Sequence, residues 1–216
     1  AIFDCWQHGS PMDFDGRFYK HTLMTPMFDP GPNPHGIPPV LLGALGPRMT
    51  EVAGEVADGL IVHPFNSMRF LENNAMPAVL RGLEKSGRQR TDFILQINAI
   101  VITGETEEAI SAATESVKGL LGFYASTPAY RPPMEAVGYE DLQPELNALS
   151  KQGKWDALGS FIDDDFLEHF TTRGAPSEIA AKLKDKYGQY ADRLAIYAPY
   201  AAPDDMWRKI IAELKN

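Results

Sequence analysis

The sequence has little cysteine, little excess basic charge and no long apolar run. Cys5 is the only cysteine among 216 residues, so no internal disulfide can form and a disulfide-stapled secreted domain is excluded. Asp and Glu outnumber Lys and Arg by 29 to 20, which argues against nucleic acid or an anionic membrane as a partner. No window approaches the ~20 apolar residues of a membrane span. We therefore expect a cytoplasmic protein whose partner is a small molecule.

The sequence also lacks the spacing of metal ligands. Its histidines are scattered, with no i, i+4 pair and no cysteine beside any of them. They are His8, His21, His35, His63 and His169. Asp163, Asp164 and Asp165 precede Phe166, an order typical of a helix N-terminus. We expect no metal site.

The chain length and its first residues bear on domain organisation. A chain of 216 residues is long enough for one domain with a substantial core, and we predict a single domain over residues 1–216. The chain starts with Ala, and AIFDCW resembles the end of an element more than the start of a protein. We expect a fragment or a processed chain.

Short apolar runs alternate with helical patterns along most of the chain. The runs near 39–43, 59–63, 93–102 and 193–197 read as buried strands, and the first three precede amphipathic segments. This alternation predicts an α/β fold with a parallel sheet. Four strands fit the second half of a (β/α)8 barrel, about strands 5–8, with a helical insertion over 125–173. A small doubly wound sheet is the competing architecture.

Three local patterns make further structural predictions. Met49, Val52, Ala53 and Val56 recur at helical spacing and predict the buried face of a short helix. Pro77 lies inside a second helical pattern, at 67–83, and predicts a break or kink there. In the first forty residues, FDGRFY predicts a hairpin whose Asp15-Gly16 turn takes positive φ.

The stretch GALGPRMTEVAGEVADGLIVHP follows the first buried run directly. In one interpretation Gly43 and Gly46 let backbone N–H groups approach a phosphate at the start of a helix near Arg48, with positive φ at Gly46. In the other, the glycines only turn the chain between strand and helix. Spacing alone leaves both open, because neither the dinucleotide fingerprint nor the P-loop sequence is present.

Three segments together resemble the C-terminal half of the luciferase-like monooxygenase superfamily, in its coenzyme F420-dependent oxidoreductase branch. They are FDGRFYKH, PPVLLGALGPRMTEVAGEVADGLIVHPF and GFYASTPAYRP, and the resemblance covers essentially the whole chain. It implies a deazaflavin or flavin across the mouth of a (β/α)8 barrel. The cofactor's phosphate-bearing tail would then meet the turn after the first buried run. The residues implied are Gly43, Ala44, Gly46 and Pro47, with Arg48 and Met49 as weaker candidates.

The strand ends that follow offer one more candidate. His63 ends the second buried run, and the ends of barrel strands face the active site, so it is a candidate substrate contact; a structural hydrogen bond is the alternative. Tyr124 and Tyr130, in FYASTPAYRP, are expected to be packing residues, although the resemblance would let this segment wall the substrate side. The catalytic residues remain unknown, because the resemblance places them mainly on strands absent from this sequence.

The resemblance predicts part of an F420-dependent oxidoreductase that transfers hydride between the deazaflavin and an organic substrate. An FMN-dependent luciferase-like monooxygenase is the alternative, since both cofactors present a ribityl phosphate. A non-catalytic half-barrel that binds a partner is a third possibility. We expect a homo-oligomer when the chain is full length.

Overall fold

The computed structural model describes residues 1–215, and its contacts divide the chain into two compact units. The units are Ala1–Val40 and Leu41–Asn216. In the first unit, helix α1 (Ile2–His8) precedes the antiparallel pair β1 (Phe14–Asp15) and β2 (Lys20–His21). The predicted hairpin is therefore confirmed. Its turn differs from the prediction, because Gly16 does not have positive φ.

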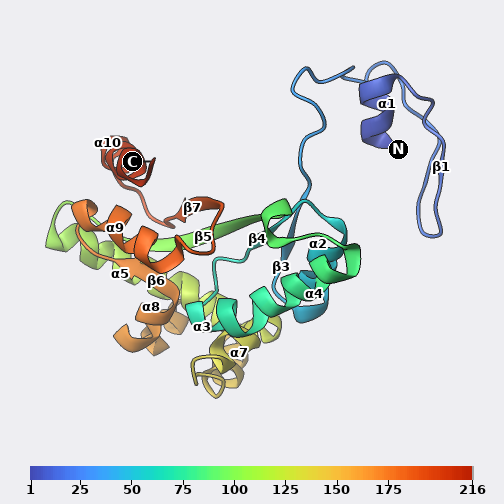
Figure 1. The fold of residues 1–216 in the computed structure, drawn as a ribbon. Coiled ribbons are helices and arrows are strands. Elements are labelled where there is room, and N and C mark those ends of the chain that lie inside the picture. The colour runs from blue at the N-terminus through green and yellow to red at the C-terminus, as the bar shows by residue number, and fades with distance from the viewer. Residues whose placement is uncertain (216) are drawn as a thin grey trace. The chain divides into compact units, whose positions relative to one another are not determined.

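The second unit contains a parallel sheet that confirms the four predicted strands. These are β3 (Leu41–Ala44), β4 (Gly59–Val62), β5 (Ile94–Ile102) and β7 (Arg193–Tyr197). Strand β5 lies between β4 and β7 and pairs with both in parallel (Figure 1). A short strand that the sequence did not predict, β6 (Thr171–Arg173), pairs with the last three residues of β5.

Helices join and cover these strands. Those between β3 and β5 are α2 (Pro47–Val56), α3 (Met68–Phe70), the π-helical turn η1 (Leu71–Ala75), α4 (Met76–Ser86) and the 3-10 turn η2 (Arg90–Asp92). After β5 come α5 (Glu107–Ala125), η3 (Pro128–Tyr130), α6 (Arg131–Glu135), α7 (Leu142–Lys151), η4 (Trp155–Phe161) and α8 (Asp164–Phe170). The chain continues through α9 (Pro176–Tyr187) and α10 (Asp204–Lys215). The segment 125–173 is thus helical apart from its turns and β6.

Two hydrophobic cores hold the second unit together. The larger one lies between the sheet and α2, α4, α9 and α10, and it takes alternate side chains of each strand, such as Leu60, Leu95 and Ile97. The smaller one joins α5 to the helical insertion around Phe65, Phe166 and Phe170. The insertion therefore has a core of its own, which it shares with the end of β5.

The sheet is open within residues 1–215. Strands β3 and β7 each pair with a single strand, so no closed barrel forms among the described residues. Their residues are half-buried or exposed, whereas most of β5 is buried. The arrangement is an α/β fold with the parallel sheet of a half-barrel.

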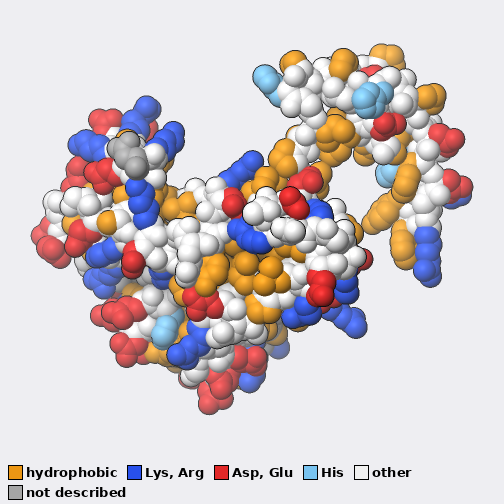
Figure 2. Space-filling model, in the orientation of Figure 1, with side chains coloured by type: hydrophobic (Ala, Val, Ile, Leu, Met, Phe, Trp, Pro, Cys, Tyr) orange, Lys and Arg blue, Asp and Glu red, His pale blue; other side chains and the backbone are white. Residues whose placement is uncertain are grey.

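Helix α2 packs against α4 through glycine rather than through large apolar residues. A Cβ at Gly54 would lie 2.4 Å from the Val79 carbonyl oxygen, and one at Gly82 would lie 2.0 Å from the Glu51 carbonyl oxygen. The sequence prediction for the buried face of this helix was wrong except at Ala53. The helices approach so closely that small residues fill the contact, and Met49, Val52 and Val56 are left exposed. Figure 2 shows that hydrophobic side chains are also exposed elsewhere on the surface.

Candidate functional site

The face of the sheet opposite the larger core carries polar side chains. Register aligns Gly43 with Ile61, Ile61 with Gln96 and Gln96 with Arg193, so these four lie in one row across the sheet. None of the four is fully buried. The Gln96 amide nitrogen donates to the Asn98 side-chain oxygen at 3.3 Å on the same face. In parallel sheets, ligands bind at the carboxyl ends of the strands. A ligand site is therefore expected in the loops that follow β3, β4, β5 and β7.

The turn from β3 into α2 has open space where the sequence predicted a phosphate cradle. A Cβ placed on Gly43 or Gly46 would meet no atom within 4 Å. Gly46 is the N-cap residue of α2 with φ −69°, so the predicted positive φ is wrong and any residue can adopt this backbone. The glycines are therefore not required by the turn itself. What they provide is room beside the backbone.

The partial positive charge at the N-terminus of α2 has no acidic side chain beside it in the first turn. Pro47 occupies the first turn, no side chain caps the helix and no acidic residue lies in its first turn. Helices α5 and α8 differ, because Thr106 and Asp163 cap them and acids follow each cap. Arg48 and Met49 are exposed in the first turn of α2. A helix N-terminus with free N–H groups and a nearby cation favours an anion.

His63 follows β4 and makes the structural hydrogen bond that the sequence left open as its alternative role. Its Nδ1 accepts a hydrogen bond from the Phe65 backbone N–H at 3.1 Å, which leaves the proton of the neutral ring on Nε2. Burial lowers the pKa of His63 below its ordinary value of 6.5. The side chain also lines a small pocket together with Ala44 and Leu45 of the glycine turn. A neutral imidazole is thus held next to the turn.

Asn66 lines the same pocket, and sequence reasoning missed it. The residue is only 5% exposed, and neither its amide oxygen nor its amide nitrogen has a hydrogen-bond partner. Buried polar groups are normally paired, because an unpaired one costs ~1–3 kcal/mol. The pocket has a volume of about 10 Å³, close to the space of one water. An unpaired donor and acceptor beside a space of this size indicate that one water completes the site.

The helix behind this pocket is irregular. Ser67 caps α3 by accepting from the Phe70 N–H, and the π-helical turn Leu71–Ala75 follows before α4 resumes with Pro77 in its first turn. The sequence predicted a break or kink at Pro77; the structure has instead a π-helical turn that ends just before it, and the chain stays helical through the proline. Phe70 and Ala75 line the pocket, so the irregular segment forms part of its wall. Single π-helical turns occur frequently at functional sites.

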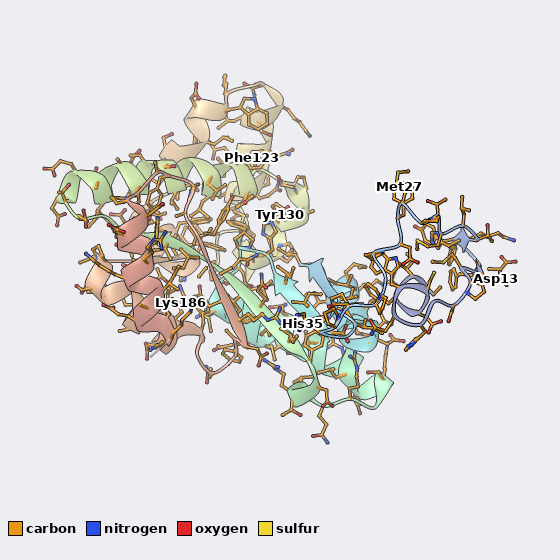
Figure 3. All side chains as sticks on the ribbon, turned by 90° about the horizontal axis from the view of Figure 1, so that it is seen from above. Asp13, Met27, His35, Phe123, Tyr130 and Lys186 are labelled. Atoms are coloured by element: carbon orange, nitrogen blue, oxygen red, sulfur yellow. The ribbon has the colours of Figure 1, made fainter. Side chains whose placement is uncertain are left out.

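The aromatic segment after α5 reaches the same strand end. The His63 ring lies 4.6 Å from the Tyr130 ring and 5.1 Å from the Tyr124 ring, between ring centroids. Burial, with a hydrogen bond to the Tyr197 hydroxyl, raises the pKa of Tyr124. Tyr130 lies beside the end of α5 that carries Phe123 (Figure 3). Both tyrosines are packing residues as predicted, and what they pack against is the candidate site.

Two of the predicted positions thus line one pocket, while Gly43, Gly46, Pro47, Arg48 and Met49 are exposed. Ala44 and His63 share the pocket with Asn66, and Gly46 is adjacent along the chain. Within residues 1–215 no group of three or more His, Cys, Asp or Glu side chains is arranged to hold a metal ion. In the same part of the chain no helix is both long and apolar enough to cross a membrane.

Comparison with known proteins places the chain in a family. The model of the luciferase-like monooxygenases matches residues 1–193. An uncharacterized protein of Mycobacterium tuberculosis is 44% identical over 194 residues, which cover 90% of this chain and 57% of that protein. The 5,10-methylenetetrahydromethanopterin reductase of Archaeoglobus fulgidus is 22% identical over 178 residues, covering 82% of this chain and 52% of the enzyme.

The fold has counterparts among solved structures. The coenzyme F420-dependent tetrahydromethanopterin reductase of Methanopyrus kandleri superposes with a TM-score of 0.72 at 21% identity, over 99% of this chain and 58% of that one. The chain spans between half and three fifths of the length of these relatives.

Proposed function

The chain belongs to the luciferase-like monooxygenase family, and we propose that it is the cofactor-binding part of an F420-dependent oxidoreductase that acts on a small organic molecule. The β3–α2 turn is the observation that carries the proposal. There, an uncapped helix N-terminus faces open space at two glycines, next to the unpaired amide of Asn66. The F420 dependence named for the Methanopyrus reductase supports the choice of cofactor.

The residues of the turn fit the phosphate-bearing tail of such a cofactor. The N–H groups of the first turn of α2 have no intrahelical partner, and no acid of that turn competes for them. A phosphate accepts hydrogen bonds from such groups, and the Arg48 side chain adds positive charge nearby. The absence of a Cβ at Gly43 and Gly46 allows a ligand to approach the backbone directly. In this proposal Gly43, Ala44, Gly46 and Pro47 line the tail, with Arg48 and Met49 at its edge.

Two further side chains lie beside the turn, around a pocket with room for one water. His63 is fixed by the Phe65 N–H, so its Nε2–H is a donor of known tautomer. Asn66 offers one donor group and one acceptor that no other group within residues 1–215 uses, and a water in the pocket would bridge them to a ligand. The rings of Tyr124 and Tyr130 cover the histidine and limit the access of water. Deazaflavin cofactors supply two-electron transfer as hydride, and these residues supply binding and orientation.

The proposal is tested by measuring the affinity of the 216-residue chain for F420 and for FMN, by fluorescence titration, in wild type and Gly46→Val. The backbone at Gly46 suits valine and its Cβ has space, so the variant should remain folded. Melting curves of both proteins check this. Loss of one charge-assisted hydrogen bond is worth ~1.5–3 kcal/mol, and we expect F420 to bind the variant about ten- to hundredfold more weakly.

Three results contradict the proposal. F420 that binds both proteins equally shows that the glycines only turn the chain. Absence of F420 binding to wild type, with both proteins folded, rejects a cofactor site on this chain and favours a non-catalytic module. Tight binding of FMN alone identifies the monooxygenase alternative.

A further inference from the structure

Strand β7 forms an edge of the parallel sheet (Figure 1), and its outer side is unpaired. Among the described residues it pairs with β5 alone. The Asp192 N–H donates to the Leu95 carbonyl oxygen of β5 at 3.0 Å, and along a strand the backbone groups of successive residues point to alternate sides. The N–H and C=O groups of Arg193, Ala195 and Tyr197 therefore point away from β5. Within residues 1–215 they have no backbone partner.

The free edge of β7 lacks the features that normally protect an edge strand. Such strands are blunted by proline, by charges along the strand, by a bulge or by a covering helix or loop. The five residues of β7 contain no proline, their only charge is at the first residue, Arg193, and none of them is buried. Their register with β5 runs without interruption to Tyr197. The opposite edge, β3, differs because Pro38 and Pro39 precede it and Pro47 follows it. Strand β7 is therefore the edge that is open to another strand.

An apolar groove lies beside this edge, between β7, α9 and α10. Its volume is about 820 Å³, and it shares no residue with the small pocket of the candidate site. Leu194 and Ile196 of β7 form part of its wall, together with Leu183 of α9 and with Ile211 and Leu214 of α10. Ile211 is 42% exposed although it is apolar. A strand that pairs with β7 would bring its own side chains over this surface and remove it from water.

We propose that β7 pairs with β7 of a second copy of the chain, antiparallel and about a two-fold axis at Ala195. Ala195 then meets Ala195 of the second copy, and Arg193 meets Tyr197 at both ends of the strand pair. Since the outward-facing residues form the hydrogen-bonded pairs of this antiparallel ladder, each of the three pairs exchanges two N–H···O bonds. The two sheets become one, and both copies contribute the same surface to the interface. The inference is independent of the proposed cofactor site.

The side chains of β7 fit this two-fold pairing. Residues directly opposite each other in an antiparallel pair lie on the same face of the sheet. The Arg193 guanidinium therefore comes beside the Tyr197 ring of the second copy, and an aromatic face attracts a cation. On the other face, which packs against the larger core, Leu194 comes opposite Ile196. A two-fold axis at Arg193 would instead place two cations opposite each other, which is destabilising, and an axis at Tyr197 would leave Arg193 beyond the paired strands.

Sedimentation equilibrium of the 216-residue chain tests the proposal with two substitutions at Ala195. Wild type should form a dimer reversibly as its concentration rises. Ala195→Pro removes the outward N–H and leaves the hydrogen bonds to β5, since an edge strand tolerates proline where its nitrogen faces solvent. The symmetric dimer loses one N–H donor from each copy, so we expect dimerisation to weaken about tenfold or more. Ala195→Ser keeps the N–H and should dimerise like wild type. Melting curves show whether all three proteins are folded.

A cysteine at the same position gives a second readout that does not depend on proline. Opposite Cα atoms of a hydrogen-bonded antiparallel pair lie ~5.5 Å apart, within the range that a disulfide spans. Ala195→Cys should therefore form a covalent dimer under mild oxidation. Ala109→Cys, exposed on α5, should not, and neither should wild type, whose only cysteine is buried.

Three results overturn the proposal. The first is a wild-type chain that stays monomeric at every concentration or forms an assembly other than a dimer. The second is a folded Ala195→Pro protein that dimerises as tightly as wild type. The third is equally fast crosslinking of Ala195→Cys and Ala109→Cys.

Discussion

The contact between α2 and α4 makes a sharp prediction at Gly54. In Gly54→Ala the new Cβ would lie 2.4 Å from the Val79 carbonyl oxygen and 3.1 Å from the Gly82 Cα. Both neighbours are backbone atoms, so relief requires the helices to separate. Overpacking costs ~1–3 kcal/mol, and a contact of 2.4 Å with a backbone atom lies at the upper end of that range, ~2–3 kcal/mol, whereas alanine in a helix gains only ~1 kcal/mol over glycine. We expect a net destabilisation of ~1–2 kcal/mol.

Gly119→Ala is the matched control. Gly119 also lies within a helix, α5, but a Cβ there would meet nothing within 4 Å. The control should gain helix propensity without a clash and melt a few degrees above wild type. In a chain of this size ~1 kcal/mol corresponds to roughly 2–4 °C, so Gly54→Ala should melt about 2–8 °C below wild type. Thermal unfolding followed by circular dichroism measures both, and a Gly54→Ala protein as stable as wild type would refute the close-packing argument.

Two further predictions concern single side chains. Asp192 accepts from the Leu95 backbone N–H at 2.8 Å and from Arg90 at 2.7 Å, and Leu95 is fully buried, so Asp192→Ala should cost ~1–3 kcal/mol in urea unfolding. As a control, Glu115→Ala removes only a long ion pair with Lys118 and should change stability by less than ~0.5 kcal/mol. If the two variants lose the same stability, Asp192 does not have the structural role given to it here. Because burial lowers the pKa of His63, the unfolded chain binds that proton more readily, and stability should fall as pH drops below 6.5. The NMR titration of the His63 ring should have its midpoint below 6.5, and a midpoint above it would disprove the burial argument.

The sequence predicted the strands correctly where a strand appears as a run of apolar residues. Strand β4 is a continuous apolar run, and β5 and β7 are largely apolar, although Gln96 and Asn98 interrupt β5 on the face opposite the larger core. Strand β6 has three residues, two of them threonine, and carries no such signal. The buried face of α2 was misjudged for a related reason. Apolar periodicity points to large residues, but Gly54 and Gly82 bring the helices too close to accommodate them.

The candidate site was only partly predictable. The glycine turn is a contiguous motif, so Gly43 and Gly46 could be identified from sequence. Asn66 could not, because its isolation depends on the positions of Ala44, Phe70 and Ala75, which come from three different elements. The resemblance to a family identified the glycine turn but did not identify the side-chain amide of Asn66.

The central claim is that an anionic cofactor tail binds at the β3–α2 turn, and backbone NMR tests it most directly. The chain is labelled with ¹⁵N-glycine, and F420 is added while the amide signals are followed. The account predicts that the Gly43 and Gly46 signals shift with the same saturation curve, while those of Gly119 and Gly138, which lie in α5 and after α6, stay in place. Saturable binding that leaves Gly43 and Gly46 unmoved would contradict it.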